Sequence, residues 1–189
     1  MDAMAIGEGG WLVVFLIVQR LAELGLAQWN TRKLRDHGAV EFGASHYPVM
    51  VALHTCWLFA LWVEGHDRPV DPVWLALFVL LQAGRVWVIA SLGRRWTTRV
   101  LVLPGAVPVM RGPYRFISHP NYVVVALEIA VVPLALGLPL LALAFTLANA
   151  AMLAWRVRVE NRALRWALGA EMTSRALTPV TLANGQPRR

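Results

Sequence analysis

The stretch Tyr122–Trp155, YVVVALEIAVVPLALGLPLLALAFTLANAAMLAW, is almost wholly apolar and is interrupted by one turn signal at Gly137 and Pro139. Each half is slightly shorter than the roughly 20 apolar residues that cross the hydrocarbon of a bilayer. Glycine and proline break helices, which favours two helices and a tight turn over one long helix. The stretch therefore predicts a membrane-embedded helical hairpin.

Three further apolar segments precede this hairpin. The chain has 189 residues and is 58% hydrophobic, against roughly 45–50% in soluble domains. A chain of this size cannot bury that much apolar surface in water. The sequence therefore predicts an all-α integral membrane protein, a bundle of about five transmembrane helices. We expect these helices at about 11–27, 48–63, 73–92, 122–136 and 138–158, in a single domain of residues 1–176 followed by a flexible tail of residues 177–189.

Charged residues alternate between the predicted loops, within a net charge of +7. The N-terminal stretch and the loop Glu64–Asp71 are mainly acidic, whereas the other loops and the segment from Arg156 are basic. Basic loops stay in the cytoplasm, and only an odd number of spans places all of them on one side. We expect a multi-pass protein of the cell membrane, with its N-terminus outside, its C-terminus cytoplasmic and its active site facing the cytoplasm.

This placement of the arginines explains the basic charge without a nucleic-acid partner, and no nucleic-acid recognition motif is present. The N-terminus lacks the positive region of a secretory signal, so the first apolar run is expected to remain as a helix. The histidines show no ligand spacing and Cys56 stands alone, so no metal site is predicted. Val100–Leu103 and Val107–Met110 favour β-structure and predict a small hairpin at the cytoplasmic surface before the fourth helix.

Polar side chains interrupt the apolar segments, and such groups are costly in hydrocarbon unless they are paired or functional. One interpretation is that they join the helices, for instance by Arg85 pairing with Glu23 or Glu128. The other is that they converge on a polar cavity. The residues concerned are Gln19, Arg20, Glu23, His54, Gln82, Arg85, Glu128 and Asn149.

The stretch Arg111–Tyr122, RGPYRFISHPNY, has the features of a helix entrance. Pro120 suits the first helical turn, where its missing N–H is not needed. Ser118 or His119 is expected to cap the helix. The free N–H groups at its start would then favour a carboxylate or a phosphate.

A second polar stretch, Arg156–Leu164, lies where the fifth helix leaves the predicted membrane. Arg156 and Glu160 are one helical turn apart, so they share a face. They can form a surface ion pair worth little stability. Alternatively, Glu160 binds a ligand ammonium group and Arg156 binds a carboxylate or enolate oxygen.

Together these stretches resemble the isoprenylcysteine carboxyl methyltransferase family, whose patterns are Arg-His-Pro-x-Tyr-x-Gly and Arg-Ile-x-x-Glu-Glu-x-x-Leu. Gln19–Leu24, Gly38–Glu41 and His46–His54 further resemble a bacterial branch that O-methylates long-chain alkylpyrones or alkylresorcinols. Ser118, Val124 and Asn161 depart from the family's arginine, glycine and second glutamate, and Arg115 is a candidate replacement for the lost arginine. The matching residues are His119, Pro120, Tyr122, Arg156, Glu160 and Leu164, with Gly112 and Tyr114 upstream.

The resemblance implies an S-adenosylmethionine-dependent O-methyltransferase with an amphiphilic or prenyl-type acceptor, a polyketide hydroxyl or an isoprenylcysteine carboxylate. Arg156 would face the acceptor. His46 and His54 are candidate bases for a phenol, or else packing residues. The implied cofactor residues are Val107, Pro108, Val109, Tyr114, His119, Pro120, Asn121, Tyr122 and Glu160.

Two alternatives stay open, a membrane reductase of the sterol-reductase-like fold with a nicotinamide cofactor and a non-catalytic membrane scaffold. Membrane lipid is an expected neighbour in every case.

Overall fold

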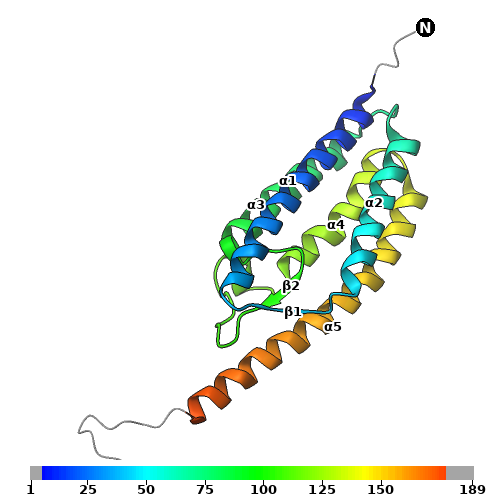
Figure 1. Cartoon of the computed structure of the whole chain (residues 1–189). Helices are drawn as coiled ribbons and strands as arrows, with labels where there is room; N and C mark the ends of the chain where they lie inside the picture. Colours follow the sequence, from blue (N-terminus) through cyan, green and yellow to red (C-terminus); the bar gives the residue numbers. More distant parts are fainter. Residues whose placement is uncertain (1–5, 178–189) are drawn as a thin grey trace, which may run out of the picture.

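The computed structural model describes residues 6–177, with side chains described as far as residue 167, and shows a bundle of five helices (Figure 1). Two short strands and two 3₁₀ turns complete the described part. The predicted tail falls, from residue 178 onward, outside the described residues. The elements are α1 (Glu8–Asp36), β1 (Val40–Phe42), α2 (His46–Gly65), α3 (Pro72–Leu92), η1 (Gly93–Arg95), β2 (Val100–Val102), η2 (Gly112–Arg115), α4 (Pro120–Ala135) and α5 (Pro139–Leu177).

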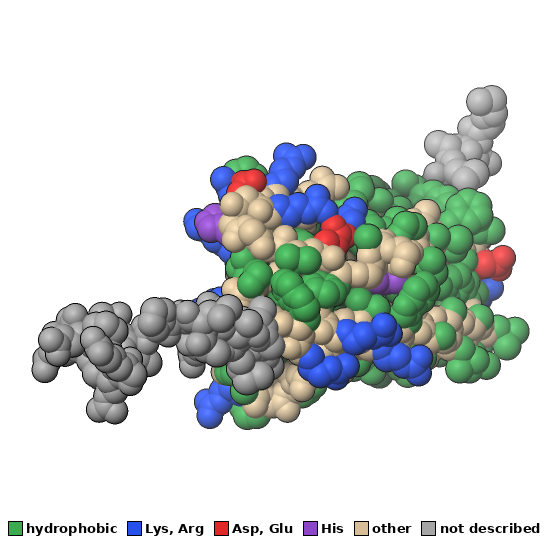
Figure 2. Space-filling view, turned by 60° about the horizontal axis from the view of Figure 1, so that its bottom comes forward, with side chains coloured by type: hydrophobic (Ala, Val, Ile, Leu, Met, Phe, Trp, Pro, Cys, Tyr) green, Lys and Arg blue, Asp and Glu red, His purple; other side chains and the backbone are tan. Residues whose placement is uncertain are grey.

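The helices present apolar side chains to their surroundings. In the described part, α1, α2, α3 and α5 are long and apolar enough to cross a membrane, and α4 is a shorter apolar helix. Leu21, Val79 and Leu140 are all more than half exposed, and Figure 2 shows hydrophobic side chains over much of the surface. Such a surface needs lipid as its solvent. The prediction of an all-α membrane protein is confirmed, while the number of crossings and the orientation of the termini stay predictions.

The first and last helices, α1 and α5, extend beyond their predicted C-terminal ends. α1 continues to Asp36 instead of ending near residue 27, and α5 continues to Leu177. Arginine, lysine and glutamine are good helix formers, so the helix persists where the apolar pattern stops. The hydropathy pattern therefore marked the apolar part of each helix and missed its polar extension.

At one end of the bundle, here called the acidic end, the ends of the helices and the turn after α2 carry Glu8, Glu64, Asp67 and Asp71. The predicted hairpin is present there, because α4 ends at Ala135 and α5 begins at Pro139. Gly9 N–H donates to the Arg68 carbonyl oxygen, at 3.0 Å, and joins α1 to the turn after α2. A Cβ on Gly9 would lie 2.0 Å from the Gly65 carbonyl oxygen, so only glycine permits this approach.

At the opposite end, here called the basic end, α1 and α3 finish, α2 and α4 begin, and α5 leaves the bundle (Figure 1). The predicted hairpin of Val100–Leu103 with Val107–Met110 is wrong. Val100–Val102 instead pairs antiparallel with Val40–Phe42, and residues 107–110 form no strand. Val100, Val102 and Phe42 of the paired strands pack with Ala163 and Ala167 of α5. A local sequence pattern does not show this distant contact.

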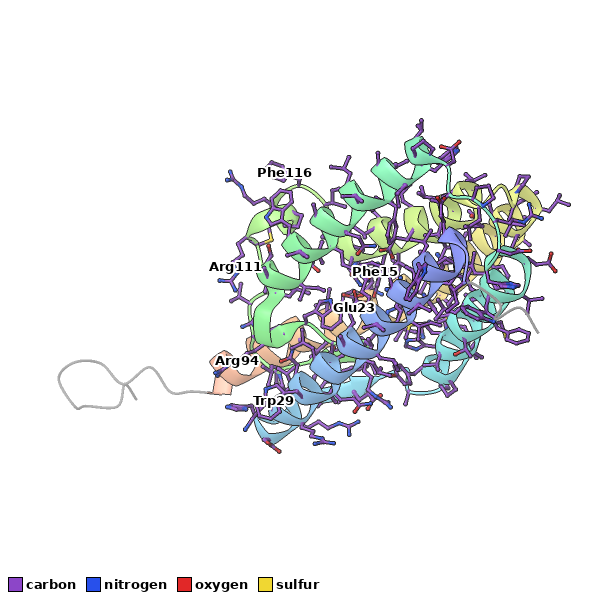
Figure 3. The ribbon with its side chains drawn as sticks, turned by 90° about the horizontal axis from the view of Figure 1, so that it is seen from above. Phe15, Glu23, Trp29, Arg94, Arg111 and Phe116 are labelled. Carbon is purple, nitrogen blue, oxygen red and sulfur yellow. The ribbon has the colours of Figure 1, made fainter. Side chains whose placement is uncertain are left out.

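A network of charged groups joins the helices between these two ends. Glu128 is fully buried, and it accepts hydrogen bonds from Arg85 Nε at 2.9 Å and Arg20 Nη2 at 2.6 Å. Both arginines also pair with Glu23, at 3.0–3.1 Å, which Figure 3 shows among the helices. Gln82 donates to Glu128 at 2.7 Å. The interpretation that polar residues join the helices is confirmed for the members of this network, which are Gln19, Arg20, Glu23, Gln82, Arg85 and Glu128. It is not confirmed for His54, which bonds within α2, or for Asn149, which makes no side-chain hydrogen bond among the described residues.

Removal of one carboxylate from this network should be costly. Glu128→Gln leaves Arg20 and Arg85 with one acid, Glu23, between them. Loss of one partner of a buried ion pair costs roughly 3–5 kcal/mol. We expect a clear fall in the thermal unfolding temperature in detergent for Glu128→Gln. Glu64→Gln, at an exposed carboxylate of the acidic end, should leave that temperature almost unchanged, and equal effects of the two variants would contradict the assignment.

Candidate functional site

A cavity of about 490 Å³ opens at the basic end. Binding sites for small molecules in proteins usually have volumes of about 300–1,000 Å³. Its walls come from residues 92–110, from the turn 114–119 and from the facing sides of α4 and α5. The cavity therefore lies where the two sequence stretches at Arg111–Tyr122 and Arg156–Leu164 meet.

The hydroxyl of Tyr122 connects the two stretches. Arg156 Nε donates to this hydroxyl at 2.8 Å, and the hydroxyl donates to the Glu160 carboxylate. The His119 ring stacks on the Tyr122 ring at 5.2 Å between centroids, and its Nδ1 lies 3.7 Å from Glu160. Arg156 and Glu160 share one phenol instead of pairing directly, so the interpretation as a surface ion pair is wrong.

Arg156 is nearly buried, with 6% of its surface exposed, and it contacts three other elements. Besides Tyr122 on α4, it donates to the Thr98 carbonyl oxygen at 2.7 Å and to the Met50 sulfur of α2 at 2.8 Å. A guanidinium carries five N–H donors in a rigid fork. After these three contacts Arg156 retains donors that can reach a ligand in the cavity.

The first turn of α4 forms another part of the wall. Pro120 occupies the first helical position and His119 the N-cap position, as the motif predicts. His119 makes no capping hydrogen bond, because its ring stacks on Tyr122. Asn121 lines the cavity, and its Oδ1 atom is buried without a partner among the described residues. The His119 carbonyl oxygen accepts from the N–H groups of Tyr122 and Val123, so the start of α4 leaves the Asn121 N–H and the Asn121 Oδ1 atom available to a ligand.

The turn before α4 supplies a tyrosine donor. Tyr114 lines the cavity, and burial, together with the nearby charge of Glu160, raises the pKa of its hydroxyl well above the usual value of 10.0. The phenol therefore stays protonated at neutral pH and can donate a hydrogen bond to a ligand.

A model of the isoprenylcysteine carboxyl methyltransferase (ICMT) family matches residues 74–166. The uncharacterized protein YpbQ of Bacillus subtilis (strain 168) is 39% identical over 161 residues, which cover 82% of this chain and 96% of that protein. The chain belongs to the isoprenylcysteine carboxyl methyltransferase family. An uncharacterized protein of Haemophilus influenzae is 22% identical over 112 residues, 57% of this chain and 65% of that protein. No solved structure matches the chain significantly.

Membership of the isoprenylcysteine carboxyl methyltransferase family supports a methyltransferase that is a multi-pass membrane protein. It does not distinguish the branch that acts on alkylpyrones, which stays a prediction. The matched region includes α3, the loop that forms the cavity, the α4–α5 hairpin and Glu160.

The cavity brings together most of the residues singled out from the sequence. The exception at the start of α4 is Pro120, which is buried and does not line the cavity. The roles that these residues would have toward a ligand stay predictions. The predicted residues that do line the cavity are Val107, Pro108, Val109, Tyr114, His119, Asn121, Tyr122, Arg156 and Glu160.

The two candidate bases lie outside this lining. His46 is buried at the start of α2, 6.0 Å from the Trp155 ring, and neither ring nitrogen has a partner among the described residues. His54 lies one turn beyond Met50 and places its Nδ1 2.9 Å from that residue's carbonyl oxygen. Since Met50 contacts Arg156, both histidines lie on the helix beside Arg156 instead of in the cavity.

The contribution of the segment after α3 to the cavity wall was not predicted from the sequence. Trp96, Thr97 and Arg99 line the cavity, although the sequence indicated only a basic loop there. A signal was present in the sequence, because an interfacial tryptophan and two threonines follow the apolar run after three intervening residues. Arg99 also lies over the Tyr47 ring, 4.1 Å from its centroid, and so ties this wall to α2.

Glu41 holds the strand pair beside the cavity by its bonds to Arg99, at 2.6 Å, and to Arg35. Burial raises the pKa of this carboxyl, but the hydrogen bonds and charges of Arg99 and Arg35 outweigh burial and hold the pKa below the usual 4.5. A carboxyl with a lowered pKa stabilises the fold above its usual pKa, and this contribution is lost as the pH falls through the lowered value.

We therefore expect Glu41→Gln to lower thermal stability at neutral pH and to lose its effect as the pH falls below 4.5 and through the lowered pKa of Glu41. The measurement is the unfolding temperature of both proteins across this pH range in detergent. Glu64→Gln is the matched control and should show a flat difference from the parent protein. A Glu41→Gln difference that stays constant with pH would contradict the assignment.

Proposed function

We propose that this protein is an S-adenosylmethionine-dependent O-methyltransferase that methylates a lipid-like acceptor at the cytoplasmic face of the cell membrane. The observation that carries the proposal is the meeting of Glu160 with His119 and Tyr122 on the wall of one cavity. Family membership supplies the methyl-transfer chemistry. The excess of arginine at the basic end supports the cytoplasmic orientation.

The groups around the cavity suit the parts of S-adenosylmethionine. Glu160 can accept hydrogen bonds from an ammonium group, and the unpartnered Asn121 Oδ1 can accept one from a hydroxyl or an amine. The Asn121 N–H, which has no partner among the described residues, and the positive end of the α4 dipole favour a carboxylate. Arg115 lines the cavity and can replace the family arginine lost at Ser118. The backbone of Val107–Val109 offers hydrogen-bonding groups to a purine.

The cofactor supplies a methyl group on a sulfonium carbon, so the chain need not provide a strong nucleophile of its own. Its task is to align the acceptor oxygen and to exclude water, effects that together can contribute several kcal/mol. The donors that Arg156 retains can stabilise the anion of a carboxylate or an acidic enol. A phenol would need a base in addition.

An amphiphilic acceptor suits a cavity placed at the end of a membrane bundle. The polar head can reach Arg156, while an alkyl or prenyl chain stays beside the apolar surface of α1 and α2. Val18 and Phe59 are among the exposed side chains of that surface, at 61% and 69%. We therefore propose as acceptor a long-chain alkylpyrone, alkylresorcinol or similar polyketide hydroxyl, or an isoprenylcysteine carboxylate.

The Glu160 assignment can be tested by calorimetry of S-adenosylmethionine binding to the protein in lipid nanodiscs. Glu160→Gln keeps the shape of the side chain and removes the charge that would meet the ammonium. We expect its dissociation constant to rise about tenfold or more, since hydrogen bonds to charged groups contribute about 1.5–3 kcal/mol. Glu64→Gln should bind as the parent protein does.

Transfer of a labelled methyl group to the three acceptor classes should then separate the enzyme from its alternatives. A reductase would oxidise a reduced nicotinamide and transfer no label, and a scaffold would do neither. No cofactor binding by the parent protein would overturn the proposal.

His46 and His54 can be tested by comparing acceptors. If either histidine is the base for a phenol, His46→Asn or His54→Asn should lower kcat for an alkylresorcinol by roughly 10²–10⁴. The same variant should leave kcat unchanged for an acceptor that is already a carboxylate. Equal losses for both acceptors would show that the histidine only packs the bundle, as its position outside the cavity lining would then suggest.

A further inference from the structure

A second depression, shallow and open, lies at the basic end beside the end of α3. Arg94 and Arg95 reach it from η1, and Arg111 reaches it from the residue before η2. Figure 3 shows Arg94 and Arg111 on the same side of the bundle. The remaining lining is apolar: Leu92, Val109 and Met110. Three cationic side chains therefore surround one apolar floor.

The backbone holds this arrangement in place. Arg111 Nε donates to the Ser91 carbonyl oxygen at 2.8 Å, and Arg95 Nη1 donates to the Val107 carbonyl oxygen at 2.6 Å. Gly112 has a φ of +58°, and a Cβ there would lie 2.1 Å from Ser91 Oγ. The chain after Arg111 thus packs directly against the end of α3, and the three arginines stay together.

None of these three guanidinium groups pairs with a carboxylate among the described residues. The nearby acids have other partners. Glu41 forms ion pairs with Arg35 and Arg99, and Glu160 accepts a hydrogen bond from the Tyr122 hydroxyl. Three like charges around one depression repel each other, and a shared anion would relieve that repulsion. The guanidinium fork suits the oxygens of a phosphate group.

Apolar side chains surround the three arginines. Met110 is 69% exposed at the edge of the depression, and Phe116 is 73% exposed on the same loop. Val86 and Trp87, one to two turns earlier on α3, are also more than half exposed. A free phosphate ion gains nothing from these groups, whereas a phospholipid places its phosphate at the end of a membrane helix and its acyl chains along it.

We infer that Arg94, Arg95 and Arg111 bind the phosphate of an anionic phospholipid, with its acyl chains along the outer face of α3. S-adenosylmethionine contains no phosphate, and Arg94 and Arg111 do not line the proposed cofactor cavity, so the lipid site adjoins that cavity without coinciding with it. Leu92, Arg95, Val109 and Met110 line both depressions. A bound lipid would therefore also steady the cavity wall, a consequence that rests on the proposed function.

The test is native mass spectrometry of the detergent-solubilised protein titrated with phosphatidylglycerol, phosphatidylcholine or inorganic phosphate. We expect phosphatidylglycerol to bind more tightly than either alternative. Arg94→Gln should weaken phosphatidylglycerol binding about fivefold, the effect of one basic residue at an anionic surface, and Arg94→Gln/Arg111→Gln should weaken it further. Arg94 makes no hydrogen bond in the described contacts, so its variant should fold normally.

Arg158→Gln and Arg158→Gln/Arg162→Gln are the matched controls, because they remove the same charges from exposed positions on α5. They should bind phosphatidylglycerol as the parent protein does. Equal losses of binding in the Arg94 and Arg111 variants and in the Arg158 and Arg162 variants would show a diffuse charge effect and overturn the proposed site. Inorganic phosphate that binds as tightly as phosphatidylglycerol would also overturn it. Lipid binding is read without methyl transfer, so its failure is separate from failure of the proposed function.

Discussion

The buried carboxylate of Glu128 is the constraint around which the bundle is arranged. Hydrocarbon offers no water to a charge, so an ionised Glu128 requires cationic partners within hydrogen-bonding distance. Arg20 and Arg85 provide them, and Glu23 balances their second charge. One network thereby fixes the positions of α1, α3 and α4 along the membrane normal, which nonspecific apolar contacts between helices do not do.

Glu128 lies on α4, the helix whose first turn lines the cavity. Tyr122 and Glu128 are six residues apart on α4, which is about 9 Å along the helix axis. Once Glu128 is held, the first turn of α4 is held at the basic end as well. The short turn at Gly137 then returns α5 antiparallel, so that Arg156 and Glu160 arrive beside Tyr122. The side chains of the candidate site are thus positioned by a charge network whose members Arg20, Glu23, Arg85 and Glu128 do not line the cavity.

The sequence pattern predicted those features of the fold that depend on residues close together in the chain. The helical class, the hairpin at Gly137 and the start of α4 at Pro120 follow from apolar runs and from the conformational limits of glycine and proline. The helix pairing through Arg85 followed from the cost of charge in hydrocarbon. The strand pairing was not predicted because Phe42 of β1 and Val100 of β2 are 58 residues apart in the sequence. Thr98 and Met50 were not predicted as partners of Arg156 for the same reason. Contacts of that kind depend on how whole helices pack.

Two groups of arginines at the basic end differ in their partners, although both fit the rule that basic loops stay in the cytoplasm. The rule explains why basic residues gather on one side of a membrane, and any exposed position there would satisfy it. Arg99 and Arg156 have defined partners and line the cavity, and Arg35 pairs with Glu41 in the strand beside it. Arg94, Arg95 and Arg111 have backbone contacts at most, yet the loop packing holds them together at a depression. Since clustering unpaired charges is unfavourable unless an anion joins them, the second group indicates a ligand that the fold itself does not supply.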